Sequence, residues 1–218
     1  MLSIGIGHAK SVLEDLLDVI SSSVGSLTNP LKLSNTFASV KKMSIADDTI
    51  AKYLDYFMDS FLLYKAQRFD VKGRKYIGSP LKYYFSDIGL RNARLNFRQQ
   101  EENHIMENII YNELRYRDYS VDVGIVEYNY KNAERKSVRS QLEIDFVASN
   151  GSDKLYIQSA LSVSDEEKRM QEVKSLKRVN DSFRKIVVIK DNIIPWYDDD
   201  GIYYIGIEKF LLGEGTDL

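Results

Sequence analysis

The chain has 218 residues, a formal net charge of −2 and no cysteine. The lack of cysteine excludes disulfide bonds, thiol catalysis and cysteine-based zinc sites. A charge this close to neutral gives no global attraction for nucleic acid, so any such binding needs a local basic patch. No apolar run approaches the roughly 20 residues of a membrane span, and the first residues lack a signal-peptide pattern. We therefore expect a cytoplasmic protein without a membrane partner.

The first ninety residues show helical periodicity followed by a strand pattern. Leucine and isoleucine recur at helical spacing, which predicts three helices over residues 9–24, 33–43 and 44–63. The second helix would begin at Ser34, and Ser44 would cap the third. Residues 64–87 are aromatic and β-branched around a Lys-Gly-Arg turn, which indicates a two-stranded ribbon. Three helices and a ribbon predict a winged helix-turn-helix domain over residues 1–90.

The rest of the chain alternates helices with short apolar strands. Residues 91–100 are polar and basic, and we interpret them as a linker. Helices are expected at 101–117 and 164–180, with a closing helical turn at 208–212. Strands are expected at 119–128, 141–148, 154–161, 185–190 and 201–207, and the sequence SNGSD predicts a hairpin turn between the second and third of them. This order predicts an α/β domain over residues 101–218, within a chain that is α+β overall.

A set of polar residues converges on one face of the predicted hairpin. Because neighbouring side chains in a strand face opposite ways, Asp145, Gln158 and Ala160 are expected to line a common surface. On the preceding helix, Glu107 lies at the edge of the buried stripe, which is unusual for a glutamate.

The sequence resembles the C-terminal region of prokaryotic AAA-type ATPases, a region known as a domain of unknown function. The resemblance is carried, in order, by RFDVKGRK, KYYFSDIGLRNA, ENIIYNELRYRDYSV, EIDFV and LYIQSAL. It implies that the last part has the restriction-endonuclease fold, with the PD-(D/E)xK signature. It further implies an AAA-type ATPase domain as partner, which is covalent in relatives, with ATP bound only by that domain.

Mapped onto the nuclease signature, the chain lacks two of its parts. Glu107 matches the helix carboxylate and Asp145 the motif aspartate, but Gln158 stands where the second acid belongs and Ala160 where the lysine belongs. Such nucleases use Mg²⁺ between carboxylates to generate hydroxide, and the lysine helps to orient and deprotonate water. We therefore expect a vestigial site with no hydrolysis and no cofactor in this chain. Two alternatives stay open: an active Mg²⁺-dependent nuclease, and a metal held without cleavage by Glu107, Glu143 and Asp145.

DNA binding is the third function considered. The predicted third helix is acidic on its exposed side, which would repel a duplex. The ribbon instead interleaves basic residues with aromatic ones, which suits contacts with phosphates and bases. Its nucleic-acid-binding candidates are Lys65, Arg68, Lys72, Arg74, Lys75 and Lys82. The same pattern would also suit an ordinary ribbon whose aromatic residues pack inward. The sequence thus predicts an accessory binding or regulatory region, with DNA contact through the wing as one form of it.

Overall fold

The computed structural model describes residues 2–98 and 101–214, and it is a mixed α/β structure. The residues divide into two compact units. Unit 1 comprises the chain up to Ala66 together with Ser79–Asn108, and unit 2 comprises Gln67–Gly78 together with the chain from Ile109 onward. Where a domain boundary lies along the chain stays a prediction. Within the described ranges, no helix is both long enough and apolar enough to span a bilayer.

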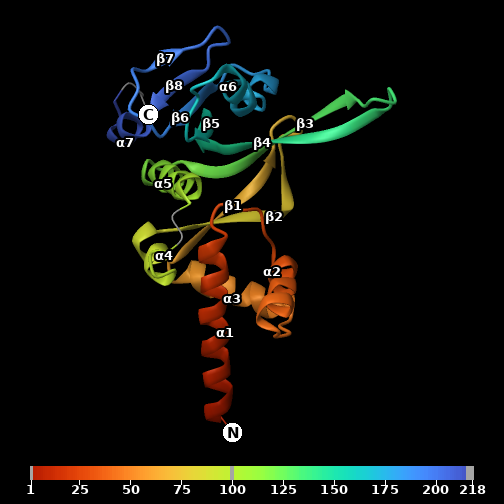
Figure 1. The fold of residues 1–218 in the computed structure, drawn as a ribbon, viewed down its shortest axis with the longest axis vertical. Coiled ribbons are helices and arrows are strands. Elements are labelled where there is room, and N and C mark those ends of the chain that lie inside the picture. Colours follow the sequence, from red (N-terminus) through yellow and green to blue (C-terminus); the bar gives the residue numbers. More distant parts are fainter. Residues whose placement is uncertain (1, 99–100, 215–218) are drawn as a thin grey trace. The chain divides into compact units, whose positions relative to one another are not determined.

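Unit 1 is mainly helical (Figure 1). Its elements are α1 (Leu2–Ser22), α2 (Pro30–Thr36), the π-helical turn η1 (Phe37–Lys41), α3 (Asp47–Asp59), α4 (Ile88–Arg94) and the first part of α5 (Glu102–Tyr116). Its core is formed by fully buried apolar side chains from several of these elements, among them Leu16, Ile20, Phe37, Ile50 and Leu54. The three predicted helices are therefore confirmed, although the second is short and ends in the π-helical turn.

The predicted starts of the second and third helices were wrong. Asn29 caps α2, because its side chain accepts a hydrogen bond of 2.7 Å from the Lys32 amide, and Pro30 follows in the first turn. Ser34 lies inside α2, and its hydroxyl donates instead to the Ile45 carbonyl oxygen. The residue before α3 is Ala46, which has no side-chain cap, so Ser44 does not cap that helix.

The predicted ribbon is confirmed as the hairpin of β1 (Leu63–Asp70) and β2 (Lys75–Phe85). The base of this hairpin belongs to unit 1, where Tyr84 and Phe85 are almost fully buried. Its tip, Gln67–Gly78, belongs to unit 2. There β1 pairs in parallel with the next strand of the chain, from Arg68 opposite Val123 to Asp70 opposite Ile125.

Unit 2 is built on a mixed sheet (Figure 1). Its further strands are β3 (Ser120–Lys131), β4 (Ser137–Asn150), β5 (Asp153–Ala160), β6 (Arg184–Ile189), β7 (Trp196–Tyr197) and β8 (Tyr203–Gly206). With the hairpin tip included, the strand order is β2-β1-β3-β4-β5-β6-β8-β7. β4 pairs antiparallel with both β3 and β5. β6 pairs parallel with both β5 and β8. All five predicted strands of this region are present, and only the two-residue edge strand β7 was missed.

One face of this sheet is covered by the segment that follows β5. The predicted helix at 164–180 is divided into α6 (Glu166–Val173) and the 3₁₀ turn η2 (Leu176–Arg178). Its Val173 and Leu176 are fully buried in a cluster with Tyr156 and Val187 of the sheet. The final helix α7 (Ile207–Leu212) follows β8 directly and buries Phe210.

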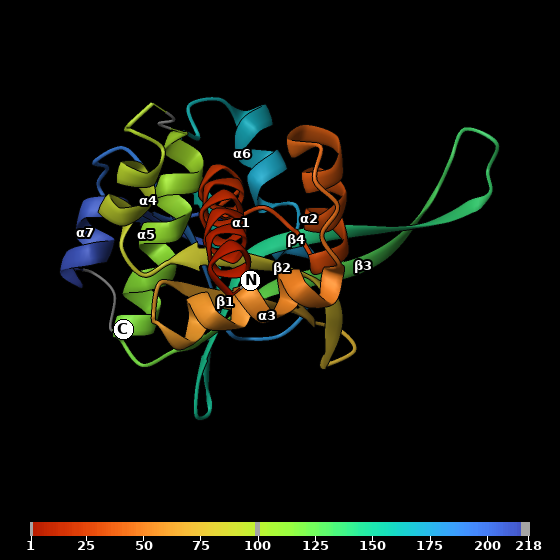
Figure 2. The same cartoon turned by 90° about the horizontal axis from the view of Figure 1, so that it is seen from below.

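The strands β3 and β4 continue beyond the rest of the sheet. β3 pairs with β1 only at Val123–Ile125, and β4 pairs with β5 only at 146–150. The intervening residues 127–141, which we call the β-arm, pair only with each other, from Glu127 opposite Gln141 to Lys131 opposite Ser137. Figures 1 and 2 both show this pair of strands reaching away from the sheet of unit 2.

Candidate functional site

The predicted hairpin of β4 and β5 brings Asp145 into contact with Gln158 of the neighbouring strand. The register runs from Phe146 opposite Ile157 to Asn150 opposite Asp153, and Gly151 has the positive φ of 58° that the tight turn requires. Gln158 Nε2 donates to Asp145 Oδ2 at 2.9 Å, and the backbone amide of Ser159 donates to the same oxygen at 2.8 Å. Asp145 therefore holds two adjacent strands together as a hydrogen-bond acceptor.

This hydrogen bonding bears on metal binding. The Gln158 and Ser159 N–H groups both donate to Asp145 Oδ2, so a divalent cation would compete with two hydrogen bonds for that oxygen. The remaining Gln158 oxygen is buried without a hydrogen-bond partner in the described part of the chain. The neutral amide of Gln158 supplies less charge for Mg²⁺ than a carboxylate at this position would. The arrangement favours structural pairing of the strands over water activation.

Ala160 lies on the same strand two residues beyond Gln158, and it is 3% exposed. It belongs to the buried cluster that includes Val173 and Leu176 of the segment covering the sheet. A lysine at this position would have to bury its ammonium group among aliphatic side chains, which is costly. The place where the nuclease signature puts its lysine is therefore part of the hydrophobic core.

Glu107 lies in unit 1, and its partners are other groups of that unit. Its Oε1 accepts a hydrogen bond of 2.8 Å from Lys82 Nζ and one of 2.6 Å from the Tyr84 hydroxyl. The side chains of Lys82 and Glu107 are 5% and 12% exposed, so this ion pair is largely buried. The structure thus pairs Glu107, which was predicted for the nuclease-like site, with Lys82, which was predicted to bind nucleic acid.

Across residues 2–98 and 101–214, no group of three or more histidine, aspartate or glutamate side chains is arranged to hold a metal ion. Of the three carboxylates considered as metal ligands, Glu107 belongs to unit 1, whereas Glu143 and Asp145 belong to unit 2. Glu143 lies on β4 opposite Ile125, and Asp145 and Glu107 are engaged as described above. A cation site formed by these three residues stays a prediction.

The six basic candidates occupy different environments. Lys72, Arg74 and Lys75 are exposed at the hairpin tip in unit 2, and Lys65 is exposed on β1 in unit 1. Arg68 is half-buried and donates from Nη2 to Gln141 Oε1 at 3.0 Å. Lys82 is the exception, because its ammonium group is buried against Glu107.

The turn at the hairpin tip is fixed by a buried carboxylate. Asp70 is 7% exposed, and its Oδ1 accepts a hydrogen bond of 2.9 Å from the Gly73 amide. A Cβ at Gly73 would come within 2.3 Å of the other carboxylate oxygen, so a larger residue there would displace the Asp70 side chain. The hydrogen bond therefore orders the backbone from which the exposed Lys72 and Arg74 side chains project.

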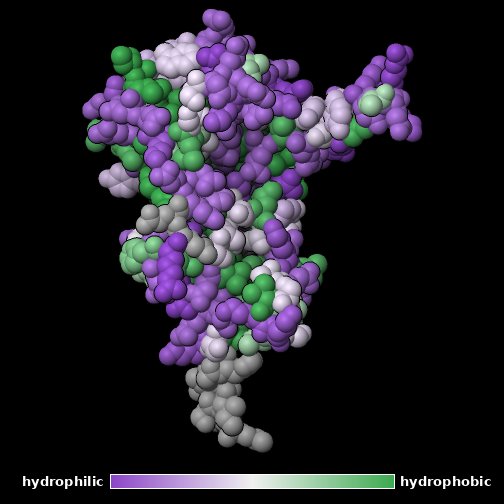
Figure 3. All heavy atoms as spheres, viewed as in Figure 1, coloured by the Kyte–Doolittle hydropathy of each residue, from purple (hydrophilic) through white to green (hydrophobic). Residues whose placement is uncertain are grey.

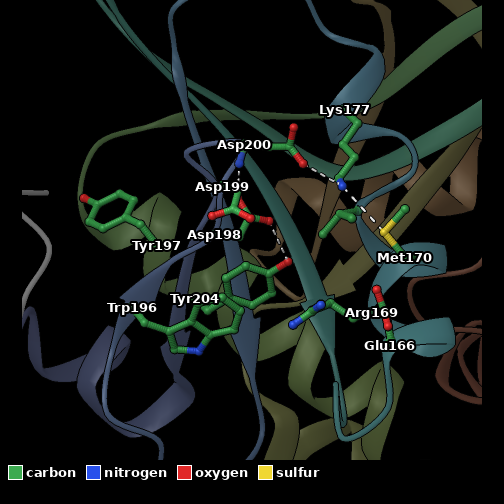
Figure 4. A pocket seen from close by; sticks show the side chains of 11 residues that line it. Glu166, Arg169, Met170, Lys177, Trp196, Tyr197, Asp198, Asp199, Asp200 and Tyr204 are labelled. Carbon is green, nitrogen blue, oxygen red and sulfur yellow. Dashed lines mark hydrogen bonds and ion pairs between the residues drawn. The ribbon is translucent and has the colours of Figure 1, made fainter.

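Sequence reasoning missed a pocket of about 280 Å³ in unit 2 (Figure 4). Trp196 stacks on Tyr204 in it, with ring centroids 4.1 Å apart and an interplanar angle of 2°. The Tyr204 hydroxyl donates to Asp198 Oδ2 at 3.1 Å, and burial together with this carboxylate raises the pKa of Tyr204. Lys177 forms an ion pair of 2.6 Å with Asp200.

The pocket carries charges of both signs around an aromatic floor. Figure 4 shows Arg169 and Glu166 of α6 beside the stacked rings, and the Arg169 guanidinium carbon is 5.8 Å from the Trp196 ring centroid. The run Trp-Tyr-Asp-Asp-Asp at 196–200 was the available signal. It was not recognised because its partners on α6 and η2 are 20 to 30 residues earlier in the chain.

Comparison with known proteins gives a family match for part of the chain and one longer relative. A family model described as a domain of unknown function (DUF8612) matches residues 4–101. An uncharacterized protein of Haemophilus influenzae is 32% identical over 201 residues, which are 92% of this chain and 46% of that protein. The chain thus spans about half the length of the curated relative it matches. No solved structure matches the chain.

Proposed function

We propose that this chain is a non-hydrolytic nucleic-acid-binding region that acts as an accessory part of an AAA-type ATPase. The observation that carries the binding function is the exposed basic run at the hairpin tip. Lys72, Arg74 and Lys75 all lie within four residues, on a turn fixed by Asp70. Cations presented on a rigid turn suit the phosphate backbone of a nucleic acid.

The lack of hydrolysis is supported by the chemistry around Asp145. The carboxylate accepts two strand-linking hydrogen bonds, and the position of the absent lysine is filled by Ala160 in the core. A nuclease would have to generate hydroxide without a second acid and without a lysine. The chain therefore binds without cutting.

The finer fold and the ATPase context belong to the same proposal. The succession α1, α2, α3 and the β1–β2 hairpin supports a winged helix-turn-helix, and α5 followed by β3, β4 and β5 supports a restriction-endonuclease-like domain. The relative from Haemophilus influenzae is about twice as long as this chain, which leaves room in that protein for a further domain. An ATPase domain, attached or separate, would be the partner and would be the part that binds ATP.

Binding is tested by fluorescence anisotropy of a labelled duplex across a salt series. Neutralising Lys72, Arg74 and Lys75 to glutamine should reduce the slope of log K against log salt by up to about 2.7, at about 0.9 for each lost phosphate contact. A matched variant neutralises three exposed lysines elsewhere, Lys52, Lys168 and Lys174, and should keep the slope. Absent or salt-independent binding would refute the proposal, and so would an equal loss in the matched variant.

Cleavage is tested separately with supercoiled plasmid in Mg²⁺ or Mn²⁺. The expected result is intact plasmid at high protein concentration. Cleavage that disappears in Asp145→Ala would replace the proposal by the active-nuclease alternative.

A further inference from the structure

The β-arm is a two-stranded ribbon that carries more basic than acidic residues. In residues 127–141 the basic side chains are Lys131, Arg135, Lys136 and Arg139 and the acidic ones are Glu127 and Glu134, which gives a net charge of 4 − 2 = +2. The whole chain has a net charge of −2, so the net charge of this segment is opposite in sign to that of the chain. Figure 3 shows hydrophilic colour over most of the end of the arm.

The two faces of the β-arm differ. Cross-strand pairing places Tyr128 opposite Ser140 and Tyr130 opposite Val138, so these side chains share one face. Asn129 lies opposite Arg139 on the other face. Tyr130 is 46% exposed and its ring is 6.0 Å from that of Tyr128. The ribbon thus offers an aromatic face and a polar face along its length.

The end of the β-arm is an ordered turn. The Asn132 amide donates to the Lys136 carbonyl oxygen at 3.0 Å, and the Lys136 amide donates to Asn132 Oδ1 at 2.9 Å. Arg135 has a positive φ of 59°, and its amide donates to the Asn132 carbonyl oxygen. These bonds therefore fix the path of the backbone at the tip, from which the basic side chains project.

The ion pairs of the β-arm are weak enough to be exchanged. Arg139 pairs with Glu127, and Lys136 pairs with Glu134 at 2.8 Å, but the Lys136 and Glu134 side chains are both about three-quarters exposed. Exposed pairs of this kind contribute about 0–1 kcal/mol, so a phosphate can replace the carboxylate at little cost. Lys131 and Arg135 have no ion pair with a carboxylate among the described residues.

The root of the β-arm adjoins the basic hairpin tip. Lys72 Nζ donates to the Glu127 carbonyl oxygen at 2.9 Å, and Arg68 contacts Gln141 on the opposite strand. Basic groups thus follow one another from Lys72 at the root of the arm to Arg135 at its end, all within unit 2. A ligand that spans this distance needs regularly spaced negative charges.

We propose that the β-arm enters a groove of double-stranded DNA while the hairpin tip contacts the adjoining phosphates. The major groove of B-form DNA is about 12 Å wide and admits a two-stranded ribbon. The deep and narrow major groove of A-form RNA does not admit one. This inference rests on the proposed nucleic-acid-binding function and adds the ligand class and the contacting element.

The test compares the full chain with two variants on labelled duplex DNA, duplex RNA and single-stranded DNA of one sequence. The first variant replaces residues 130–138 with Asn-Gly, so that Asn129 and Arg139 are joined by a two-residue turn. The second is the double variant Lys131→Gln, Arg135→Gln, which leaves the ribbon intact. Thermal unfolding of both should match the wild type, because the changed residues lie outside the cores.

The shortened variant should bind duplex DNA at least ten-fold more weakly and become insensitive to a major-groove dye that competes with the wild type. The double variant should lower the salt slope by about 1.8, at about 0.9 for each lost contact. Wild-type binding that both variants retain in full would overturn the inference and leave the proposed function standing. The inference would also be overturned if duplex RNA or single-stranded DNA bound as tightly as duplex DNA and lost that binding in the shortened variant. If the wild type binds no nucleic acid, the proposed function itself fails.

Discussion

The buried ion pair of unit 1 gives the sharpest test of how the chain uses its charges. Lys82→Met keeps the length and most of the volume of the side chain but removes the ammonium group 2.8 Å from Glu107 Oε1. Glu107 then remains buried with only the Tyr84 hydroxyl as a described partner of that oxygen. Removing one partner of a buried pair costs about 3–5 kcal/mol, because it leaves an uncompensated charge. We expect a loss of about 3 kcal/mol in the free energy of unfolding.

The measurement is urea unfolding at pH 7, followed by circular dichroism. The double variant Lys82→Met, Glu107→Gln should recover more than half of the loss, because the neutral amide is cheaper to bury and still accepts from Tyr84. Lys41→Met is the matched control, since Lys41 pairs with Asp15 in the same unit but both side chains are partly exposed. It should cost about 0–1 kcal/mol. If Lys82→Met costs no more than Lys41→Met, the pair does not stabilise the unit as argued. Lys82→Met should also leave the salt slope of DNA binding unchanged.

Three further outcomes follow from burial. Ala160→Lys should destabilise the chain by more than about 3 kcal/mol and restore no plasmid cleavage, whereas Lys168→Ala, an exposed change, should be neutral in the same urea assay. Burial, and then the nearby Asp55 carboxylate, raises the pKa of Tyr83 to about 12. Since an unfolded tyrosine ionises near pH 10, this residue's stabilising contribution is complete below pH 10 and is lost as the pH rises to 12. The loss is about 3 kcal/mol, and Tyr83→Phe should make stability fall less steeply over that window. Tyr204→Leu removes the ring stacked on Trp196, the single tryptophan, so its emission should shift to longer wavelength; Tyr197→Leu, at the exposed neighbour, should leave the emission unchanged.

The elements that local pattern determines were predictable. Alternating polarity and the turn at Gly151 fix the register of β4 and β5, and Asp145 and Gln158 meet across the two strands, on the common surface expected for them. Hydrophobic periodicity likewise located α1, α3 and α5. In each case the signal lies within about fifteen neighbouring residues, so tertiary contacts were not needed to read it.

The misplaced features depend on partners distant in sequence. Lys82 reads as one more basic residue of an exposed ribbon, and its ion pair with Glu107, 25 residues later, accounts for its burial. The helix α4 occupies part of the predicted linker because Arg91 is fully buried and donates from Nε to the Ser21 carbonyl oxygen, 70 residues earlier. Nothing in the composition of RNARLNFRQQ indicates that an arginine would lie inside.

The route of the polypeptide between the two compact units has a consequence for how the protein can change. The chain passes from one unit to the other at residues 66/67, 78/79 and 108/109. The shortest continuous fragment that contains all of unit 1 must therefore carry the hairpin tip of unit 2, and the converse fragment must carry part of unit 1. A single recombination junction cannot exchange one unit for another, and a ribosome cannot complete either before it has made part of both.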